Sequence, residues 1–168
     1  DDLIFDRAKV GKVFKFFSLM NINTNNEYKQ FNLMPFQAFI IANIYGFYWK
    51  DSGRRRFRYS YLEMARKSGK TMFSSGLSQY HLVADGENDP EVLFLATTRE
   101  QSGIALKYAK SIIANSPVLS KRVDVLQWFL RFTQKRDGKT STGVLKTLAS
   151  NADRLDGYNP SYVLIDEY

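Results

Sequence analysis

The sequence has no cysteine, which excludes a disulfide framework and a cysteine-ligated zinc site. Its one histidine, His81, argues against a histidine-rich metal site. No apolar run approaches the roughly 20 residues of a membrane-spanning helix. The early stretch VFKFFSLM contains Lys15 and lacks the cleavage pattern of a signal peptide. These absences favour a soluble, intracellular protein.

What is present suits a globular chain of 168 residues, of which 44% are hydrophobic and 15% aromatic. Lys and Arg number 24 against 17 Asp and Glu, and the net charge of +7 favours polyanionic partners. Many domains of this charge bind no nucleic acid. The chain starts at Asp1 rather than Met and stops at Tyr168, so we expect a fragment of a longer protein.

The N-terminal part of the sequence predicts two helices. Residues 3–20 carry apolar side chains at helical spacing, and the polar stretch 21–29 predicts a loop. Pro35 suits the first turn of a second helix. Residues 36–49 are apolar nearly all round, which predicts that this helix is largely buried.

The middle of the chain alternates between strand and helix patterns. Residues 54–64 alternate enough to predict a strand, and a loop and a helix from about 69 to 83 follow. The continuous apolar run at 92–98 is typical of a buried parallel strand, and residues 99–115 predict a helix.

The last third of the chain predicts three more strands. Residues 123–133 and 143–150 are joined across Arg136-Asp137-Gly138-Lys139, where Asp-Gly is a strong hairpin signal. Residues 162–165 form a last apolar strand. The whole order predicts an α/β fold with a mainly parallel sheet flanked by helices and a β-hairpin at about 123–150.

The stretch MARKSGKT, from Met64 to Thr71, ends like a phosphate-binding P-loop. In such a loop, backbone N–H groups and the helix dipole bind the anion, Lys70 reaches the outer phosphates and Thr71 offers its hydroxyl to Mg²⁺. Met64 stands where the usual first glycine would fall. By itself, the tripeptide Gly69-Lys70-Thr71 fits a solvated helix start equally well.

The stretch YVLIDE supplies the carboxylates that a Mg-nucleotide site needs at the end of a neighbouring strand. Asp166 would hold the water shell of the metal, and Glu167 would orient and deprotonate the attacking water. Two acids after a strand are common, and alone they favour a simple strand-end cap. Together with the loop they indicate a nucleotide site, and Glu167 favours hydrolysis over kinase chemistry.

From Phe31 to Tyr168 the chain resembles the ATPase domain of the large terminase subunit of tailed bacteriophages, the DNA-packaging motor. The resemblance is carried by FNLMPFQ at 31–37, ARKSGKT at 65–71, LFLATTREQSGIA at 93–105 and ASNADRLDGYNPSYVLIDEY at 149–168. Terminases commonly lack the first loop glycine and carry an arginine inside the loop, here Arg66. The resemblance implies a P-loop NTPase fold of the ASCE (RecA-like) type over 35–168, after a helical lead-in segment at 1–34, with the chain ending after the second (Walker B) motif.

The resemblance also implies roles for single residues. Gln37 would read the adenine edge, although an exposed polar residue in the first turn of a helix is the alternative. Arg66 would sense or stabilise the γ-phosphate, unless it is a surface arginine. Arg154 could act in trans on a neighbour's nucleotide, but a salt bridge to Asp153 or Asp156 is the stronger alternative. The nucleotide contacts would come from Gln37, Arg66, Lys67, Ser68, Gly69, Lys70 and Thr71, the metal ligands from Thr71 and Asp166, and catalysis from Glu167, Arg66 and Lys70.

The activity implied by the resemblance is hydrolysis of Mg-ATP that drives double-stranded DNA into a procapsid. The implied partners are DNA, the portal protein, the small terminase subunit and copies of the chain in a ring on the portal, with a monomer in solution also compatible. The implied location is the cytoplasm of a bacterial host, transiently on the procapsid. The family's coupling segment and nuclease domain are absent from this chain, so we expect ATP binding, slow hydrolysis and no DNA cleavage. A helicase or other P-loop translocase, and a non-hydrolysing nucleotide-dependent DNA-docking module, are the alternatives.

Two basic stretches are candidates for contact with DNA or a neighbouring subunit. One contains Arg54, Arg55, Arg56 and Arg58, interleaved with aromatic residues. The other lies at the expected hairpin tip, with Lys135 and Arg136. For either stretch alone, a solvated edge is the simpler interpretation. We expect the hairpin tip to be the more exposed of the two.

Overall fold

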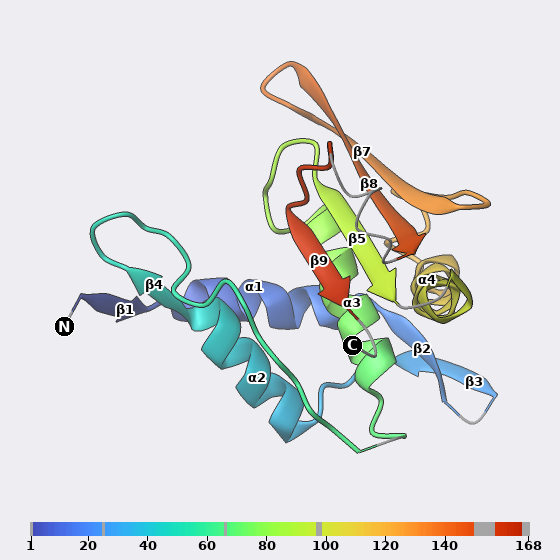
Figure 1. Ribbon diagram of the computed structural model, residues 1–168, viewed down its shortest axis with the longest axis horizontal. Coiled ribbons are helices and arrows are strands. Elements are labelled where there is room, and N and C mark those ends of the chain that lie inside the picture. Colours follow the sequence, from blue (N-terminus) through green and yellow to red (C-terminus); the bar gives the residue numbers. More distant parts are fainter. Residues whose placement is uncertain (1, 25, 66, 97–98, 150–156, 166–168) are drawn as a thin grey trace.

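The computed structural model describes residues 2–24, 26–65, 67–96, 99–149 and 157–165. Its central feature is a five-stranded sheet with the order β6-β7-β8-β5-β9 (Figure 1). β5 (Glu91–Ala96) pairs parallel with β8 (Lys139–Ala149) on one side and with β9 (Tyr162–Ile165) on the other. β7 (Phe129–Arg136) and β6 (Val123–Val125) extend the sheet with antiparallel pairs. The expected α/β fold, with parallel strands at its centre and an added hairpin, is confirmed.

The hairpin between β7 and β8 turns at the Asp-Gly pair, as predicted. Asp137 and Gly138 both have positive φ angles, 50° and 75°. Two positive φ angles in a two-residue loop define the turn type whose twist matches that of the flanking strands. Pairing continues right up to this turn, with Arg136 opposite Lys139. The single strand predicted at 123–133 was wrong, because the chain forms two antiparallel strands there, β6 and β7. β8 starts at Lys139 rather than at 143, and the ribbon of β7 and β8 projects from the body of the sheet (Figure 1).

Two helices pack beside the sheet: α3 (Lys70–Val83) leads into β5, and α4 (Arg99–Asn115) connects β5 to β6. α3 lies behind β5 and β9 in the view of Figure 1, and α4 lies beside it. Ser75 Oγ donates to the Ala105 carbonyl at 3.2 Å, a direct bond between the two helices. The bounds predicted for both helices and for the strands at 92–98 and 162–165 are confirmed to within two residues.

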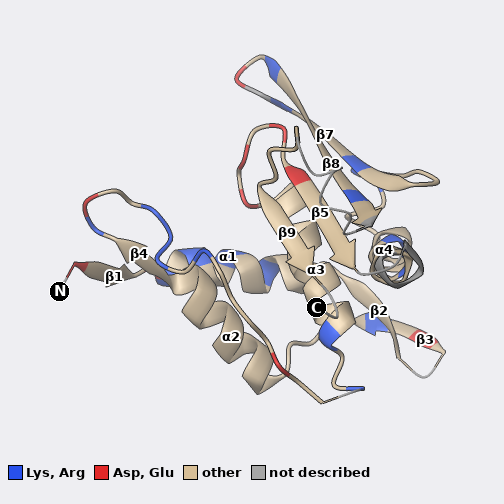
Figure 2. Ribbon diagram, in the orientation of Figure 1, with Lys and Arg blue, Asp and Glu red and all other residues tan. Residues whose placement is uncertain are grey.

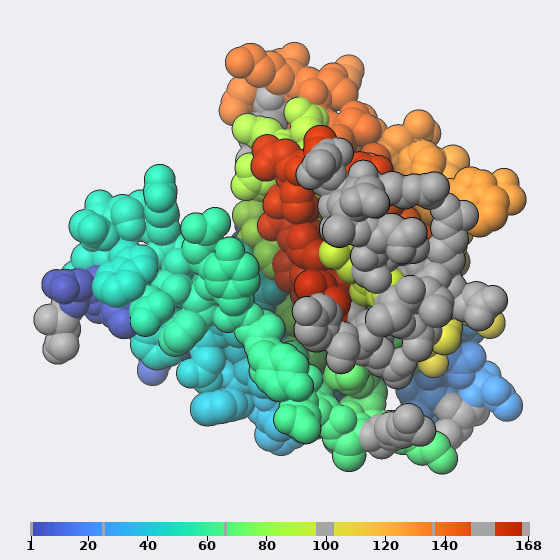
Figure 3. Space-filling model, in the orientation of Figure 1, coloured from blue at the N-terminus to red at the C-terminus, as the bar shows by residue number. Residues whose placement is uncertain are grey.

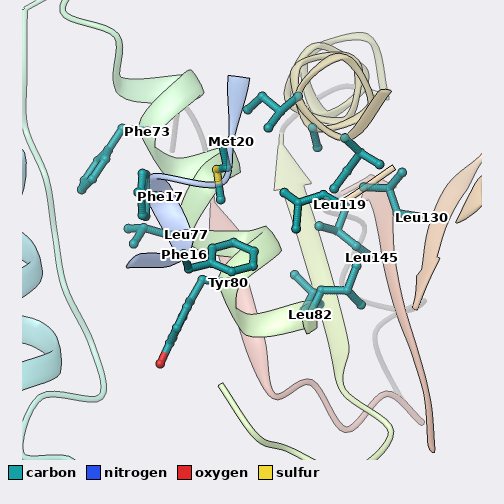
Figure 4. Close-up of a cluster of buried hydrophobic side chains, with 14 of the residues drawn as sticks. Phe16, Phe17, Met20, Phe73, Leu77, Tyr80, Leu82, Leu119, Leu130 and Leu145 are labelled. Carbon is teal, nitrogen blue, oxygen red and sulfur yellow. The ribbon is translucent and has the colours of Figure 1, made fainter. Parts of the chain in front are cut away.

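The hydrophobic core joins the N-terminal segment to the sheet (Figure 4). α1 (Arg7–Phe17) packs against α3, and a Cβ on Gly76 would meet the ring of Phe17 at 2.8 Å. A side chain on Gly76 would therefore force these helices apart. The residues labelled in Figure 4 are Phe16, Phe17, Met20, Phe73, Leu77, Tyr80, Leu82, Leu119, Leu130 and Leu145.

The first thirty residues differ from the prediction in two places. The first helix starts at Arg7, because the Asp6 carboxylate accepts the N–H groups of Ala8 and Lys9 at 2.9 and 3.0 Å and caps it there. The strand β1 (Leu3–Phe5) precedes the helix. The stretch expected to be a loop forms a hairpin of β2 (Asn21–Thr24) and β3 (Glu27–Gln30). Its strands are mostly exposed and polar, so apolar alternation gave no signal for them.

The second helix, α2 (Pro35–Gly46), begins at the expected proline but ends early. Residues Phe47–Trp49 leave it as β4 and pair antiparallel with β1. The prediction that the helix is largely buried was wrong, since Phe39 is 70% exposed. An apolar composition all round the helix does not bury it, because neighbours cover only the face that contains Ile41 and Tyr45.

The predicted strand at 54–64 was also wrong. Within the described chain, this stretch makes one isolated bridge, between Arg55 and Tyr48, and is otherwise irregular. Its alternating residues include Tyr59 and Tyr61, which are 90% and 84% exposed. Alternation predicts a strand only where a neighbouring strand offers its hydrogen-bonding edge, and here none pairs with the segment.

Candidate functional site

The loop that leads into α3 has the backbone of an anion-binding turn. Lys67 and Gly69 both have left-handed φ angles, 66° and 78°. Successive residues of this kind turn backbone N–H groups toward a common point. Gly69 is the N-cap of α3, and a non-glycine residue would be strained there. A left-handed conformation at Lys67, which is not a glycine, is typical of functional loops.

The N-terminus of α3 carries the positive electrostatic potential of a helix start. Its first turn contains no acidic residue, and no side chain of the described residues caps it. The first N–H groups of a helix have no partner within the helix, and the helix dipole adds a partial positive charge. Lys70 and Thr71 are the first two residues of this helix and are half-buried. A cation, a hydroxyl and helix N–H groups of the kinds that bind phosphate therefore belong to the first turn of one helix.

Gln37 lies in the first turn of α2 and is 4% exposed, so the alternative of an exposed polar residue is wrong. Its side-chain oxygen accepts the N–H of Met34 at 2.9 Å. Gln37 thus caps its own helix, and this role alone accounts for its burial. The contact with adenine stays a prediction.

The strand β9 runs along α3 toward the phosphate loop. The ring of Tyr162, at the start of β9, stacks on His81, near the end of α3, with ring centroids 4.1 Å apart. The two elements are therefore antiparallel, and the carboxyl end of β9 points toward Lys70. On the opposite face of the sheet, β9 is open to solvent (red in Figure 3), with Ile165 54% exposed. Arg66, Arg154, Asp166 and Glu167 lie outside the described residues.

The basic candidates fall into two groups (Figure 2). Arg54, Arg56 and Arg58 are exposed in the loop after β4, as are Lys135 and Lys139 at the hairpin tip. Arg55 differs: its guanidinium pairs with Asp85 at 2.7 Å and lies over the ring of Tyr45, 4.8 Å from its centroid. Both stretches therefore present free surface, but Arg55 is engaged within the chain.

A buried polar network, not foreseen from the sequence, surrounds the single histidine. His81 Nε2 lies 2.9 Å from the hydroxyl of Tyr45, and His81 Nδ1 lies 2.9 Å from the carboxylate of Asp85. Asp85 in turn holds Arg55. The one sequence signal was a histidine four residues before an aspartate at a helix end, a spacing that puts both on one face. We call Tyr45, His81, Asp85, Arg55 and Tyr162 the His81 hub.

Burial and charge set the protonation states of the hub. Burial lowers the pKa of His81 below its ordinary 6.5, although Asp85 acts in the opposite direction. Burial alone would raise the pKa of Asp85, but the neighbouring His81 and Arg55 together hold it well below its usual range. Burial raises the pKa of Tyr162 to about 12. The hub therefore contains a neutral imidazole, a carboxylate and a guanidinium at neutral pH.

These shifts predict that the folded chain loses stability in mild acid. The unfolded chain binds a proton at His81 near pH 6.5, whereas the folded chain binds it only at lower pH. The stability that neutral His81 contributes is present above pH 6.5 and falls below it, by up to about 1.4 kcal/mol per pH unit. Urea unfolding at pH 7 and pH 5.5 measures this, and His81→Gln should flatten the dependence. Equal slopes for both proteins would contradict the assignment.

The described residues contain no group of three or more His, Asp or Glu that could hold a metal ion by themselves. A metal here would therefore need Thr71 or residues outside the described ranges. No helix within the described ranges is long and apolar enough to cross a membrane.

Comparison with known proteins gives a family and a fold. The model of the terminase large subunit, ATPase domain, matches residues 35–168. The crystal structure of the HK97 bacteriophage large terminase aligns with a TM-score of 0.73 and 23% identity, over 95% of this chain and 31% of that chain. A mutant of the large terminase ATPase domain of Thermus phage P74-26 aligns with a TM-score of 0.48 and 17% identity, over 61% of this chain and 45% of that one. No curated protein matches the sequence.

Proposed function

Because the chain belongs to the family of terminase large subunit ATPase domains, we propose that it hydrolyses Mg-ATP to drive double-stranded DNA into a procapsid. The observation that carries this proposal is the family match over residues 35–168, which includes the phosphate loop and the strand before Asp166. The left-handed loop backbone and the glycine that begins α3 support it. Residues 35–168 would be the ATPase domain, after a lead-in segment at 1–34.

The phosphates of ATP would lie over the loop at 65–71. The N–H groups of Gly69 and Lys70 would donate to phosphate oxygens at the positive end of α3. Lys70 and Arg66 would neutralise the charge that develops on the transferring phosphoryl group. Glu167 would accept a proton from the attacking water, and Arg154 of a neighbouring copy could approach the same phosphate.

Adenine recognition by Gln37 is compatible with the cap that this residue already makes. The oxygen of an amide side chain has two lone pairs, and the N–H of Met34 uses one of them. The second lone pair could accept the adenine amino group while the amide nitrogen donates to N7. Gln37 would then read adenine without releasing Met34, so that α2 need not unwind.

The proposed metal ligands fit Mg²⁺ by their chemistry. The Thr71 hydroxyl lies in the first turn of α3, and the Asp166 carboxylate follows β9; both offer the oxygen atoms that Mg²⁺ prefers. Thr71 and Asp166 would hold the Mg²⁺, which when bound would offset the negative charge of the phosphates.

The test of this function is release of phosphate from ATP by the wild-type chain, with and without Mg²⁺ and double-stranded DNA. Release that requires Mg²⁺ supports the ATPase. Tight binding of Mg-ATP without release would instead favour a nucleotide-dependent docking module. Stimulation by single-stranded rather than duplex nucleic acid would favour the helicase alternative.

We further propose that the chain works with the portal protein and the small terminase subunit, in a ring on the portal, inside a bacterial host cell. The chain spans 31% of the length of the HK97 large terminase.

The exposed hairpin tip offers a test of DNA contact. Charge reversal of Lys135 and Arg136 to Glu should weaken the binding of duplex DNA. It should also reduce the salt dependence of binding, because fewer phosphate contacts release fewer counterions from the DNA. Charge reversal of Lys12 and Lys15, exposed on α1, makes the same change in net charge and serves as the control. DNA affinity and self-association that stay unchanged in the tip variant would reject the contact.

A further inference from the structure

The His81 hub joins three elements at the ends that lie away from the proposed nucleotide site. Tyr45 belongs to the last turn of α2, His81 to the last turn of α3, and Tyr162 is the first residue of β9. His81 touches the other two directly, through a 2.9 Å bond to the Tyr45 hydroxyl and a ring stack at 4.1 Å on Tyr162. One buried imidazole thus contacts all three elements.

Each of these elements carries one part of the proposed nucleotide site at its other end. Gln37 lies in the first turn of α2, Lys70 begins α3, and β9 leads to Asp166. The 14 residues of α3 span roughly 20 Å at 1.5 Å per residue. The hub therefore touches no nucleotide, but it holds the far ends of the elements that would carry the adenine, phosphate and metal contacts.

We propose that the His81 hub is a positioning device that fixes the relative orientation of α2, α3 and β9 and thereby sets nucleotide affinity from a distance. This proposal rests on the proposed function, because it concerns the same nucleotide site. His81, Tyr45 and Tyr162 are positioning residues in it.

The hub is suited to this task because its partners are specific and enclosed. His81 is 4% exposed and Tyr45 is 2% exposed, so water cannot replace a lost partner. Leaving a buried polar group without its partner costs about 1–3 kcal/mol. The neutral imidazole must direct its proton at Asp85 and accept the proton of Tyr45. The Tyr45 bond and the ring stack on Tyr162 together restrain how the three elements lie against one another.

Burial opposes protonation of His81 in this arrangement, whereas Asp85 favours protonation and Arg55 opposes it. Arg55 approaches from the loop after β4, and Lys9 and Lys12 of α1 line the adjacent cavity of about 450 Å³. Tyr48, Tyr80 and Glu87 line the same cavity, and Asp85 is shared with Arg55. A second proton on His81 would also face the hydroxyl proton of Tyr45. Protonation of His81 should therefore weaken the contacts of the hub. Because the proposed nucleotide site depends on these contacts, bound nucleotide should favour unprotonated His81.

The first test compares two variants that each remove one buried hydroxyl. Tyr45→Phe keeps the ring and its packing on Tyr80 but removes the bond to His81. Ser116→Ala removes a fully buried hydroxyl that joins α4 to Asn21 and touches none of the three elements. Both should lower stability in urea, but only Tyr45→Phe should raise the Kd for Mg-ATP, by about tenfold. Equal Kd values for the two folded variants would overturn the proposal.

The second test needs no mutation, because the chain has a single histidine. The pKa of His81 is followed by NMR with and without a non-hydrolysable Mg-ATP analogue. The negative charge of the bound analogue, screened over this distance, would if anything raise the pKa. The proposal predicts that the pKa of His81 falls by about one unit. This is the fall expected if the analogue binds about tenfold more tightly to the chain with unprotonated His81 than to the chain with protonated His81. An unchanged or raised pKa would overturn it.

These outcomes separate the proposal from the function on which it rests. If the wild-type chain binds the analogue but neither the Kd of Tyr45→Phe nor the pKa of His81 responds, the hub proposal fails and the ATPase proposal stands. If a folded wild-type chain does not bind the analogue at all, the proposed function fails and the hub proposal fails with it.

Discussion

Replacement of Lys70 by Ala should raise the Kd for Mg-ATP by about 100-fold or more, which corresponds to ~2.7 kcal/mol. Lys70 is the first residue of α3, at the positive end of the helix and beside the left-handed Gly69. Removal of one partner from a hydrogen-bonded charge pair in a shielded site costs about 2–5 kcal/mol. The loop N–H groups stay in place in this variant, so the loss measures the contribution of the cation alone.

The measurement is competition against a fluorescent ATP analogue, with circular dichroism to verify folding. Lys107→Ala, on the exposed side of α4, is the matched control and should bind as the wild type does. Wild-type affinity in the Lys70→Ala variant would mean that the loop does not hold the phosphates, whatever its sequence resembles.

Replacement of Glu167 by Gln should lower the rate of ATP hydrolysis by about 10²–10⁴-fold, the usual contribution of a general base. Gln has nearly the same size and can still orient a water molecule, but it cannot take the proton. Binding of Mg-ATP should change little, because Glu167 would act on the water rather than on the nucleotide. The variant therefore separates catalysis from binding, in contrast to Lys70→Ala.

Single-turnover release of phosphate is the appropriate assay, because slow product release cannot hide the chemical step in it. Glu27→Gln, which removes a carboxylate exposed on β3, is the control and should keep full activity. Unchanged hydrolysis in Glu167→Gln would assign the base elsewhere. Absence of hydrolysis in the wild type as well would favour the docking module.

The elements that the sequence predicted well are those whose signals are local. β5 and β9 are short apolar runs between turn residues, and the Asp137-Gly138 turn requires backbone angles that few residues adopt. α3 begins directly after the left-handed Gly69. In each case the residues that decide the structure lie within a few positions of it.

The predictions that were wrong depended on neighbours that a pattern does not contain. The alternating stretch 54–64 lacks a strand to pair with, and α2 exposes Phe39 because no element covers that side. The polar hairpin of β2 and β3 was missed for the opposite reason: its strands pair with each other and need no apolar face.

The candidate site likewise has a part that depends on neighbouring residues in the sequence and a part that depends on distant ones. The start of α3 after Gly69 could be predicted, and phosphate binding there by Lys70 and Thr71 stays a prediction, because both depend on consecutive residues. The His81 hub could not, because Tyr45, His81 and Tyr162 meet only after three separate elements have packed. Arg55 illustrates the difference: the sequence placed it in a basic run, and the fold pairs it with Asp85.

The central claim is that the loop before α3 is a working nucleotide site, and the most direct test is calorimetric titration of the wild-type chain with Mg-ATP. The chain of 168 residues contains the loop, α3 and the strand before Asp166, so it should suffice for binding. The account predicts saturable binding of one Mg-ATP per chain. A chain that is folded by NMR and circular dichroism but gives no saturable binding would contradict it.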